Sequence, residues 1–331
     1  MKTLILSQEN EKKIAFKESP KPVPQKGEVL VRILAAALNR RDQWMREEKY
    51  PKLLYGAIMG SDACGIVEEV GDSADQHWLG KTVVINPNNE WGENPDVQSS
   101  SYHILGMPSD GTFAEYIVRN SDKLAEKPTF LTPTQAAAIP LAGLTAFRAI
   151  FRHGKVQEKT KVLITGIGGG VATFAFQFAL AVGAEVYVSS GSETKLQKAQ
   201  EMGARGGFNY KNADWTKKMQ EVGGFDVVID SAGGEAINHF IRLLKPAGKI
   251  VFYGASTGLP EKIDLYRMFF KQIGLQGSTM GNDTEFLEMI KFIEKHQIEP
   301  IIDAVFGFEH IFDAFDALKN GNQLGKLVIE L

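Results

Sequence analysis

The chain has 331 residues, of which 44% are hydrophobic and 23% charged, with a formal net charge of -3. This ordinary globular composition is long enough for two domains, and its near-neutral balance gives no case for nucleic acid or a membrane as partner. No window is apolar enough to span a bilayer, the first residues lack the pattern of a signal peptide, and one cysteine cannot form an intrachain disulfide, so we expect a cytoplasmic protein.

The first third of the sequence is predicted to be rich in β-strands. Short apolar runs at 27–38, 64–71, 81–87 and 113–120 are separated by Gly, Pro and Asp turn signals. This spacing is typical of a barrel-like or sandwich domain. The polar stretch 86–111 shows little periodicity, and we expect it to form an exposed loop or lobe whose role the sequence does not indicate.

From about residue 161 the pattern changes to strands that alternate with helices. The expected strands are 161–166, 185–190, 225–233 and 248–256, and the expected helices are 170–184, 193–204 and 235–244. Apolar strands in alternation with helices predict a parallel sheet covered on both faces, so the fold class is α/β. The tail, 321–331, again predicts a strand, which we expect to return to the first domain.

A glycine-rich turn lies in the segment KVLITGIGGGVATFAFQFA, between a buried strand and a helix. In that context the glycines let the backbone approach a pyrophosphate, and the helix offers unpaired N–H groups and the positive end of its dipole. The candidate cofactor ligands are Gly168, Gly169, Gly170 and Val171. A turn without a ligand is the weaker alternative, because the whole strand–helix–strand unit agrees with cofactor binding.

The end of the second strand of this unit indicates which dinucleotide binds. NAD sites usually carry an acidic residue there, but this chain has Ser190 and Ser192, and Lys195 follows one helical turn later. Hydroxyl groups and a lysine suit a 2′-phosphate, which a carboxylate would repel. We therefore predict NADP(H) over NAD(H), although Lys195 alone would serve equally well as a solvated helix lysine.

Several ordered sequence blocks match one known family. They are GEVLVRILAAALNRRD, GSDACGIVEEVG, DGTFAEYIV, AAAIPLAGLTAFRAI, FDVVIDSAGG and LLKPAGKIVFYGAS, beside the glycine turn and the terminal GKLV. On these blocks the chain resembles the medium-chain dehydrogenase/reductase superfamily, and most closely its zinc-free, quinone-oxidoreductase-like branch. The resemblance implies a GroES-like catalytic domain at 1–123 and 283–331, and a Rossmann NADP(H)-binding domain at 124–282.

The same family contains zinc alcohol dehydrogenases, whose ligand positions we compared with this chain. The first ligand cysteine falls at Leu38 or Asn39, the histidine at Ser61, the neighbouring glutamate at Asp62 and the third ligand at Leu141. One carboxylate cannot supply the three protein ligands of a catalytic zinc, and one cysteine cannot supply a four-cysteine structural site. We therefore expect no zinc.

The resemblance also implies roles for single residues. Toward the substrate it implies Asn39, Tyr50 and Asp62, although a structural role in a turn stays open for Asp62. Toward the cofactor it implies Thr145 under the nicotinamide, Tyr210 near the 2′-phosphate, Gly254 and Ala255 beside the cofactor, and Ser278 near the carboxamide. Arg40 stands where near relatives carry a histidine, and the sequence does not indicate its role.

Without a metal ion, hydride addition to a simple ketone loses the stabilisation of its developing negative charge. A quinone or an α,β-unsaturated carbonyl spreads that charge, so the Asn39 amide or the Tyr50 hydroxyl could suffice, with Tyr50 or water as proton donor. We predict an NADPH-dependent, metal-independent oxidoreductase for such acceptors. The alternatives are a reductase of simple aldehydes and ketones, an NADPH-binding sensor with little activity, and a zinc alcohol dehydrogenase.

Two further expectations concern the assembly and the single cysteine. The partner is a small-molecule substrate, and the resemblance suggests a homodimer in which the last strand of the cofactor sheet, around 273–279, meets its symmetry mate. Cys64 has no base or ligand partner in the sequence, so we expect it to be structural.

Overall fold

The computed structural model describes residues 1–331. The chain divides into two compact units: unit 1 comprises 1–144 and 281–331, and unit 2 comprises 145–280. Unit 1 is therefore built from both ends of the chain. Residues 124–144 fall in unit 1 in this division, whereas the sequence boundary at 124 assigns them to the cofactor domain. None of the helices combines the length and apolar character needed to cross a bilayer.

Unit 1 contains a seven-stranded sheet in the order β16-β17-β3-β4-β5-β9, with β8 paired to β3. Its strands are β3 (Glu28–Ala37), β4 (Asp62–Val70), β5 (Thr82–Ile85), β8 (Tyr116–Asn120), β9 (Leu124–Glu126), β16 (Ile302–Gly307) and β17 (Lys326–Glu330). A separate antiparallel pair is formed by β1 (Lys2–Leu6) and β2 (Ile14–Glu18). The expected return of the carboxyl-terminal strand is confirmed, because β17 pairs with β3.

Four helices lie wholly within unit 1. They are α1 (Arg40–Arg46), α2 (Pro133–Ala137), α9 (Asp283–His296) and α10 (Ile311–Asn320), with 3-10 turns η1 (Ser73–Trp78), η2 (Ser121–Lys123) and η4 (Phe308–His310). The buried residues of α10 are Ile311, Ala314, Phe315 and Leu318, which lie on one helical face. Phe315 meets Phe113 edge to face, with ring centroids 6.1 Å apart. Helix α3 (Pro140–Phe147) spans the boundary between the units.

The polar segment 86–111 is anchored more firmly than its sequence predicts. It holds two short paired strands, β6 (Asn88–Asn89) and β7 (His103–Ile104). Trp91 is only 2% exposed, its Nε1 donates to the Asn94 carbonyl at 3.0 Å, and its ring meets Tyr102 edge to face. The expectation of an exposed lobe is therefore wrong for Trp91, Leu105 and Met107, which are buried, whereas Val97 is 52% exposed.

Unit 2 is built on a six-stranded sheet in the order β12-β11-β10-β13-β14-β15, in which every neighbouring pair is parallel. The strands are β10 (Lys161–Ile164), β11 (Glu185–Ser190), β12 (Gly206–Asn209), β13 (Phe225–Asp230), β14 (Leu244–Phe252) and β15 (Gly274–Gly277). The helices are α4 (Gly170–Ala181), α5 (Glu193–Glu201), α6 (Trp215–Glu221), α7 (Ala236–Leu243) and α8 (Leu265–Lys271), preceded by the π-helical η3 (Arg148–His153). The predicted α/β class is confirmed.

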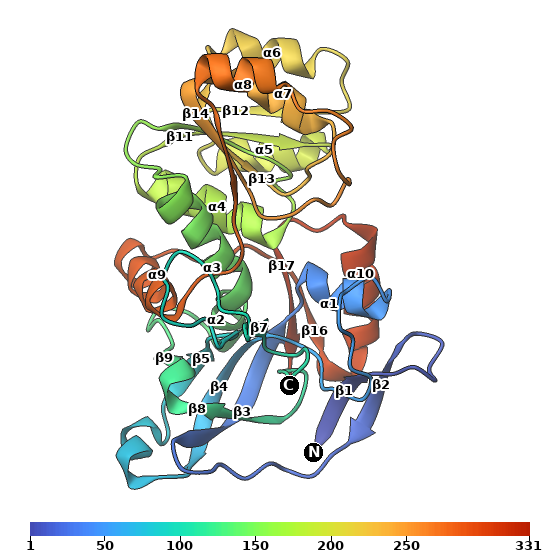
Figure 1. Ribbon diagram of the computed structural model, residues 1–331. Helices are drawn as coiled ribbons and strands as arrows, with labels where there is room; N and C mark the ends of the chain where they lie inside the picture. The colour runs from blue at the N-terminus through green and yellow to red at the C-terminus, as the bar shows by residue number, and fades with distance from the viewer. The chain divides into compact units, whose positions relative to one another are not determined.

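The helices of unit 2 lie on both faces of its sheet. Figure 1 shows α6, α7 and α8 together on one side and α4 on the other. The chain runs outward from β10 in both directions, through β11 on one side and β13 on the other. In open α/β sheets, ligands bind at the carboxyl ends of the strands where the strand order reverses. The turn after β10 is therefore at the position where a cofactor is expected.

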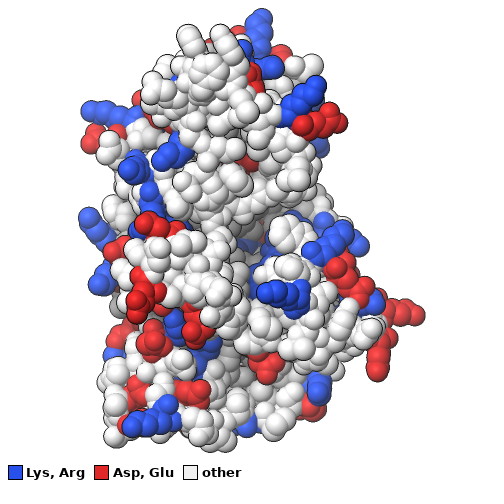
Figure 2. All heavy atoms as spheres, in the orientation of Figure 1, with Lys and Arg blue, Asp and Glu red and all other residues white.

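Figure 2 shows lysine and arginine interspersed with aspartate and glutamate on the face in view. A nucleic-acid-binding surface is expected to carry a broad positive patch. The face in view carries no broad patch of a single sign.

Candidate functional site

The glycine turn of unit 2 has the geometry of a phosphate-binding turn. Gly166 has a φ of +64°, the turn is closed by the Gly169 N–H donating to the Gly166 carbonyl at 3.1 Å, and α4 begins at Gly170. No side chain caps the start of α4. The first N–H groups of a helix have no acceptor within it, so those of Gly170 and Val171, beside the turn residue Gly168, are placed to bind an anion.

The buried carboxylate of Asp230 links the carboxyl ends of the two central strands, β10 and β13. Asp230 accepts from the Thr165 hydroxyl at 2.6 Å and from the Gly233 N–H at 2.8 Å. Burial raises the pKa of Asp230, and the Thr165 hydrogen bond opposes that shift. These bonds hold the loops after β10 and β13 side by side. Sequence reasoning did not single out Asp230, although an acidic residue that ends an apolar strand is a visible signal.

The end of β11 is arranged around two serines. Ser190 is buried, and its hydroxyl accepts from the Ser192 N–H at 3.2 Å. Ser192 caps α5 by accepting from the Lys195 N–H at 3.5 Å. The carboxylate of Glu193 accepts from the Asn209 amide at 2.6 Å, so the nearest acid is bound to the end of β12. This arrangement brings together the predicted hydroxyl groups and Lys195.

A second basic residue lies beside these serines. A β-carbon placed on Gly191 would lie 2.8 Å from the Tyr210 hydroxyl and 2.9 Å from Lys211 Cε. Tyr210, which is 51% exposed, therefore lies against the loop between Ser190 and Ser192, and its role near the 2′-phosphate stays a prediction. The sequence analysis did not predict a role for Lys211. Its only signal in the sequence is that it follows Tyr210 directly.

The remaining predicted cofactor residues gather at the loops after β14 and β15. The Ser256 N–H donates to the Ser231 carbonyl at 3.2 Å, and a β-carbon on Gly254 would lie 3.0 Å from that carbonyl oxygen, so Gly254 and Ala255 follow the loop after β13 closely. The Ser278 hydroxyl oxygen is buried without a hydrogen-bond partner. Thr145 is 6% exposed, and its hydroxyl lies 3.7 Å from Met280 Sδ, near the Ser278 segment.

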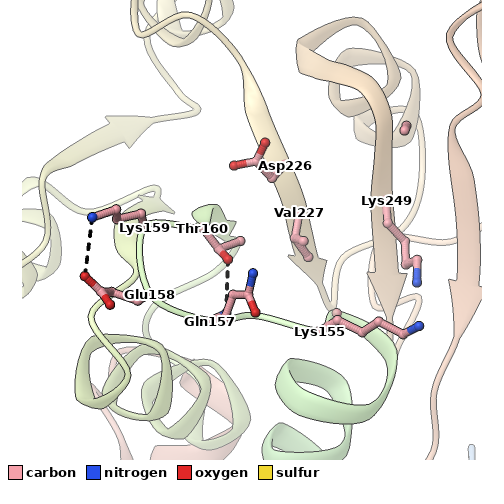
Figure 3. Close-up of a pocket in the computed structure, with 10 residues that line it drawn as sticks. Lys155, Gln157, Glu158, Lys159, Thr160, Asp226, Val227 and Lys249 are labelled. Carbon is pink, nitrogen blue, oxygen red and sulfur yellow. Dashed lines mark hydrogen bonds and ion pairs between the residues drawn. The ribbon is translucent and has the colours of Figure 1, made fainter.

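An open pocket of unit 2 lies toward the amino-terminal ends of the strands, opposite the end that carries the glycine turn. Figure 3 shows it lined by Lys155, Gln157, Thr160, Asp226 and Lys249 among other residues. These residues lie near the amino ends of β10 and β13 or within β14, whereas ligands of such sheets bind at the carboxyl ends. Lys249 also donates to the His153 carbonyl at 2.8 Å. We therefore assign no part of the cofactor site to this pocket.

A buried polar cluster lies in unit 1, and we call it the lysine centre: Asn39, Ser61, Asp62 and Lys326. Strand register brings its members together, because β3 pairs with both β4 and β17. Ala37 is opposite Asp62 on one side and Val328 on the other. Asn39, Asp62 and Lys326 are 7%, 0% and 3% exposed.

The lysine centre is closely hydrogen-bonded. Lys326 Nζ donates to Asn39 Oδ1 at 2.7 Å and to Asp62 Oδ2 at 2.9 Å. Asn39 Nδ2 donates to Asp62 Oδ2 at 2.9 Å and to Ser61 Oγ at 3.2 Å. The backbone N–H of Leu141 donates to Asp62 Oδ1 at 2.8 Å. Both oxygens of the buried carboxylate are therefore satisfied, as a buried charge requires.

Lys326 is the functional candidate that sequence reasoning missed. The terminal block GKLV contributed only to the family resemblance, although a lysine at the start of an apolar strand was a visible signal. The structure also defines the setting of Asn39, because its Nδ2 donates to two groups inside the centre. A substrate-facing role for the Asn39 amide would require it to exchange one of these partners, and that role stays a prediction.

Tyr50 lies beside a buried guanidinium. Arg41 Nε lies 3.4 Å from the Tyr50 hydroxyl oxygen, and its guanidinium carbon is 5.0 Å from the ring centroid. Arg41 Nη1 donates to the Leu105 carbonyl at 2.8 Å, and Nη2 is buried without a partner. The neighbouring Arg40 donates to the Leu318 carbonyl near the carboxyl end of α10, where a positive charge is favourable.

Asp42 caps α1 and titrates in an unusual range. Its Oδ2 accepts from the Asn39 N–H at 2.8 Å, and its burial raises its pKa from 3.8 to about 6. The folded protein therefore holds this proton more tightly than the unfolded chain, and the contribution of Asp42 to stability falls as the pH rises from about 4 to 6. Asp62 adds to the rise as a nearby like charge, whereas Arg41 opposes it.

Replacing Asp42 with asparagine is expected to remove this dependence. Relative to wild type, the Asp42→Asn protein should gain up to about 3 kcal/mol in unfolding free energy between pH 4 and pH 7, because about two pKa units are involved. Urea denaturation at both pH values measures the difference. If the unfolding free energies of variant and wild type differ by the same amount at both pH values, the raised pKa of Asp42 is contradicted. Asp303→Asn is the matched control, because Asp303 is an exposed carboxylate.

The lysine centre does not suit a zinc ion. No group of three or more His, Cys, Asp or Glu residues is disposed to hold a metal. The compared ligand positions carry Leu38 or Asn39, Ser61 and Leu141, and the neighbouring carboxylate, Asp62, is already bonded to Lys326. Cys64 is buried nearby in β4, and burial raises the pKa of its thiol to about 12, so it offers no thiolate at neutral pH.

Comparison with known proteins identifies two family models. The model "Alcohol dehydrogenase GroES-like domain" matches residues 25–129, and the model "Zinc-binding dehydrogenase" matches residues 170–295. The zinc-type alcohol dehydrogenase-like protein YogA of Leptosphaeria maculans is 37% identical, with 94% of this chain and 92% of that protein covered. The quinone oxidoreductase of Mus musculus is 27% identical, with 94% and 91% covered.

A solved structure agrees with this chain over its whole length. The crystal structure of an NAD-dependent alcohol dehydrogenase has a TM-score of 0.92 and 31% sequence identity, and the match covers 100% of both chains.

Proposed function

Because the chain belongs to the medium-chain dehydrogenase/reductase superfamily of oxidoreductases, we propose that it is an NADPH-dependent reductase of quinones or α,β-unsaturated carbonyl compounds that works without a metal ion. The observation that carries this proposal is the lysine centre. The positions compared with the family's zinc ligands carry Leu38 or Asn39, Ser61 and Leu141, and the neighbouring Asp62 carboxylate is bonded to the Lys326 ammonium. Acceptors that delocalise negative charge suit such a centre.

The residues at the end of β11 support NADPH over NADH. The glycine turn and the start of α4 would hold the pyrophosphate. Ser190, Ser192 and Tyr210 offer hydroxyl groups around one loop, and Lys195 and Lys211 supply positive charge for a 2′-phosphate. When bound, NADPH supplies the hydride for the reduction.

Tyr50 is the candidate proton donor. Its hydroxyl oxygen accepts from Arg41, so its own hydrogen is free to be directed at an acceptor oxygen. The Tyr50 hydroxyl would bind the oxygen that becomes negative on reduction, and it would deliver a proton to it.

The direct test is the initial rate of NADPH oxidation with a quinone, an enone, a saturated aldehyde and a saturated ketone. We expect turnover with the first two and a far lower rate with the others. A second candidate, reduction of simple aldehydes, is favoured by the solved alcohol dehydrogenase, and faster turnover of the saturated aldehyde would establish it. Tight NADPH binding without turnover of any acceptor would instead indicate a sensor.

A homodimer is also part of the proposal, and an apolar face of unit 2 supports it. In α8, Leu265, Tyr266, Phe269 and Phe270 are 67%, 71%, 66% and 74% exposed. The helix precedes β15, which is an edge strand of the sheet with an unpaired side. An apolar face beside an open strand edge is expected to be covered, and we propose that a second copy of the chain covers it.

Replacing Phe270 with glutamate is expected to convert the dimer to a monomer, because the charge would be buried in the interface. Size-exclusion chromatography with light scattering measures the mass directly. Leu287→Glu is the matched control, since Leu287 is an exposed leucine on α9 in unit 1. A wild-type monomer, or a Phe270→Glu dimer as stable as wild type, would contradict this interface.

A further inference from the structure

We propose that the side chains of Glu48 and Tyr55 form a clasp that positions the Tyr50 hydroxyl for proton delivery. The clasp is this pair of residues, which closes the loop 48–55 around Tyr50. The inference rests on the proposed reductase function, in which Tyr50 is the candidate proton donor. It adds two positioning residues to that function.

The backbone that carries Tyr50 makes hydrogen bonds only toward the two ends of the loop. No backbone N–H of residues 50–53 makes a hydrogen bond. On one side the Lys49 N–H donates to a carbonyl of α1 at 2.8 Å, and on the other the Leu54 N–H donates to Met107 Sδ at 3.2 Å. A segment without backbone hydrogen bonds opens easily. The position of Tyr50 therefore depends on side-chain contacts.

The clasp closes the loop through a hydrogen bond to a charged group. The Tyr55 hydroxyl donates to Glu48 Oε1 at 2.5 Å, and Lys13 Nζ lies 3.3 Å from the same oxygen. The hydrogen bond from Tyr55, followed by that from Lys13, lowers the pKa of Glu48, so its carboxylate is ionised at neutral pH. Hydrogen bonds to an ionised acceptor are stronger than those between neutral groups. The first and last residues of the loop are therefore tied together.

The backbone of Glu48 also indicates that its side chain has a use. Glu48 follows the end of α1 with a φ of +57°, a left-handed conformation that usually takes glycine at this place. A residue with a β-carbon is strained there. Glycine would fit the turn better, but it would leave the Tyr55 hydroxyl without its acceptor.

Tyr50 is held from the opposite side by the body of unit 1. Arg41 Nε lies 3.4 Å from the Tyr50 hydroxyl oxygen, and Tyr50 and Leu53 pack against the apolar core. These contacts orient the ring, and the clasp limits how far the loop can carry it away. A proton donor must lie within hydrogen-bond reach of the acceptor oxygen, so a small displacement of the loop lowers the rate.

Three variants test the clasp. Tyr55→Phe removes only the hydroxyl, and Glu48→Gly removes the acceptor while it relieves the left-handed turn. We expect kcat with an enone to fall by about 10-fold in both, with the KM for NADPH and the urea midpoint nearly unchanged, because both side chains are exposed. Glu48→Gln should retain most of kcat, because its amide oxygen still accepts from Tyr55. Tyr116→Phe, in β8, is the matched control for loss of a tyrosine hydroxyl outside the loop.

A double-mutant cycle shows whether the clasp acts through Tyr50. In a Tyr50→Phe background, Tyr55→Phe should lower kcat little further, and that result supports the inference. A second 10-fold loss in that background overturns it, as does wild-type kcat in folded Tyr55→Phe and Glu48→Gly proteins, while the reductase function stands. Unchanged kcat in Tyr50→Phe alone overturns both the clasp and the proton donor. A wild-type protein inactive with every acceptor overturns the proposed function and this inference with it.

Discussion

Replacing Asp62 with alanine is expected to destabilise unit 1 by about 3–5 kcal/mol, because it leaves the Lys326 ammonium buried without its partner. The ion pair has a separation of 2.9 Å, and its two side chains are 3% and 0% exposed. The substitution also removes the acceptor of the Leu141 N–H and of one Asn39 N–H. Two buried donors, on Lys326 and Asn39, and the part-buried Leu141 N–H therefore lose a partner in one step.

Urea denaturation followed by tryptophan fluorescence measures this effect. Three of the four tryptophans, Trp44, Trp78 and Trp91, lie in unit 1, so the signal reports mainly on the unit that contains the centre. The double variant Asp62→Asn/Lys326→Met should recover most of the lost stability, since removal of both charges avoids an unpaired buried ion. Additive losses in the double variant, or a fully stable Asp62→Ala protein, would contradict a coupled buried pair.

Replacing Lys195 and Lys211 together with alanine is expected to weaken NADPH binding by about 10²-fold and NADH binding very little. Hydrogen bonds to a charged phosphate contribute about 1.5–3 kcal/mol each, and only NADPH carries the 2′-phosphate. Calorimetric titration with each dinucleotide gives both dissociation constants. The preference should shrink further at high salt, because exposed charge pairs are screened.

Lys198→Ala is the matched control for the cofactor experiment. Lys198 lies in the last turn of the same helix, α5, and is exposed, so its loss should leave both affinities unchanged. An equal loss of NADPH and NADH affinity in the Lys195/Lys211 variant would show that these lysines do not bind the 2′-phosphate. A reverse substitution, Ser190→Asp, should favour NADH because a carboxylate there suits a ribose 2′-hydroxyl.

Local sequence patterns predicted the cofactor unit well. The glycine turn lies between β10 and α4, and the strands and helices after it alternate as expected, because each element is specified by its own periodicity and its own turn residues. Lys211 was missed because its place beside Gly191 depends on the pairing of β12 with β11, which local sequence does not specify.

The lysine centre could not be predicted in the same way. Its members come from the start of α1, the start of β4 and the start of β17, and they meet only because β3 pairs with both other strands. The pattern of one sequence predicts a strand at the carboxyl terminus but does not indicate which strands pair with it. Comparison of ligand positions indicated that zinc ligands were missing, and the structure adds that Lys326 of β17 is paired with the neighbouring carboxylate, Asp62.

The most direct test of the account measures metal content and turnover on one preparation. Purified protein is dialysed against a strong chelator and analysed for zinc by mass spectrometry, and NADPH oxidation with an enone is then recorded with and without added zinc. We expect strongly substoichiometric zinc, undiminished turnover after chelation and no stimulation by added metal. Activity that disappears on chelation and returns with zinc would contradict a metal-independent reductase.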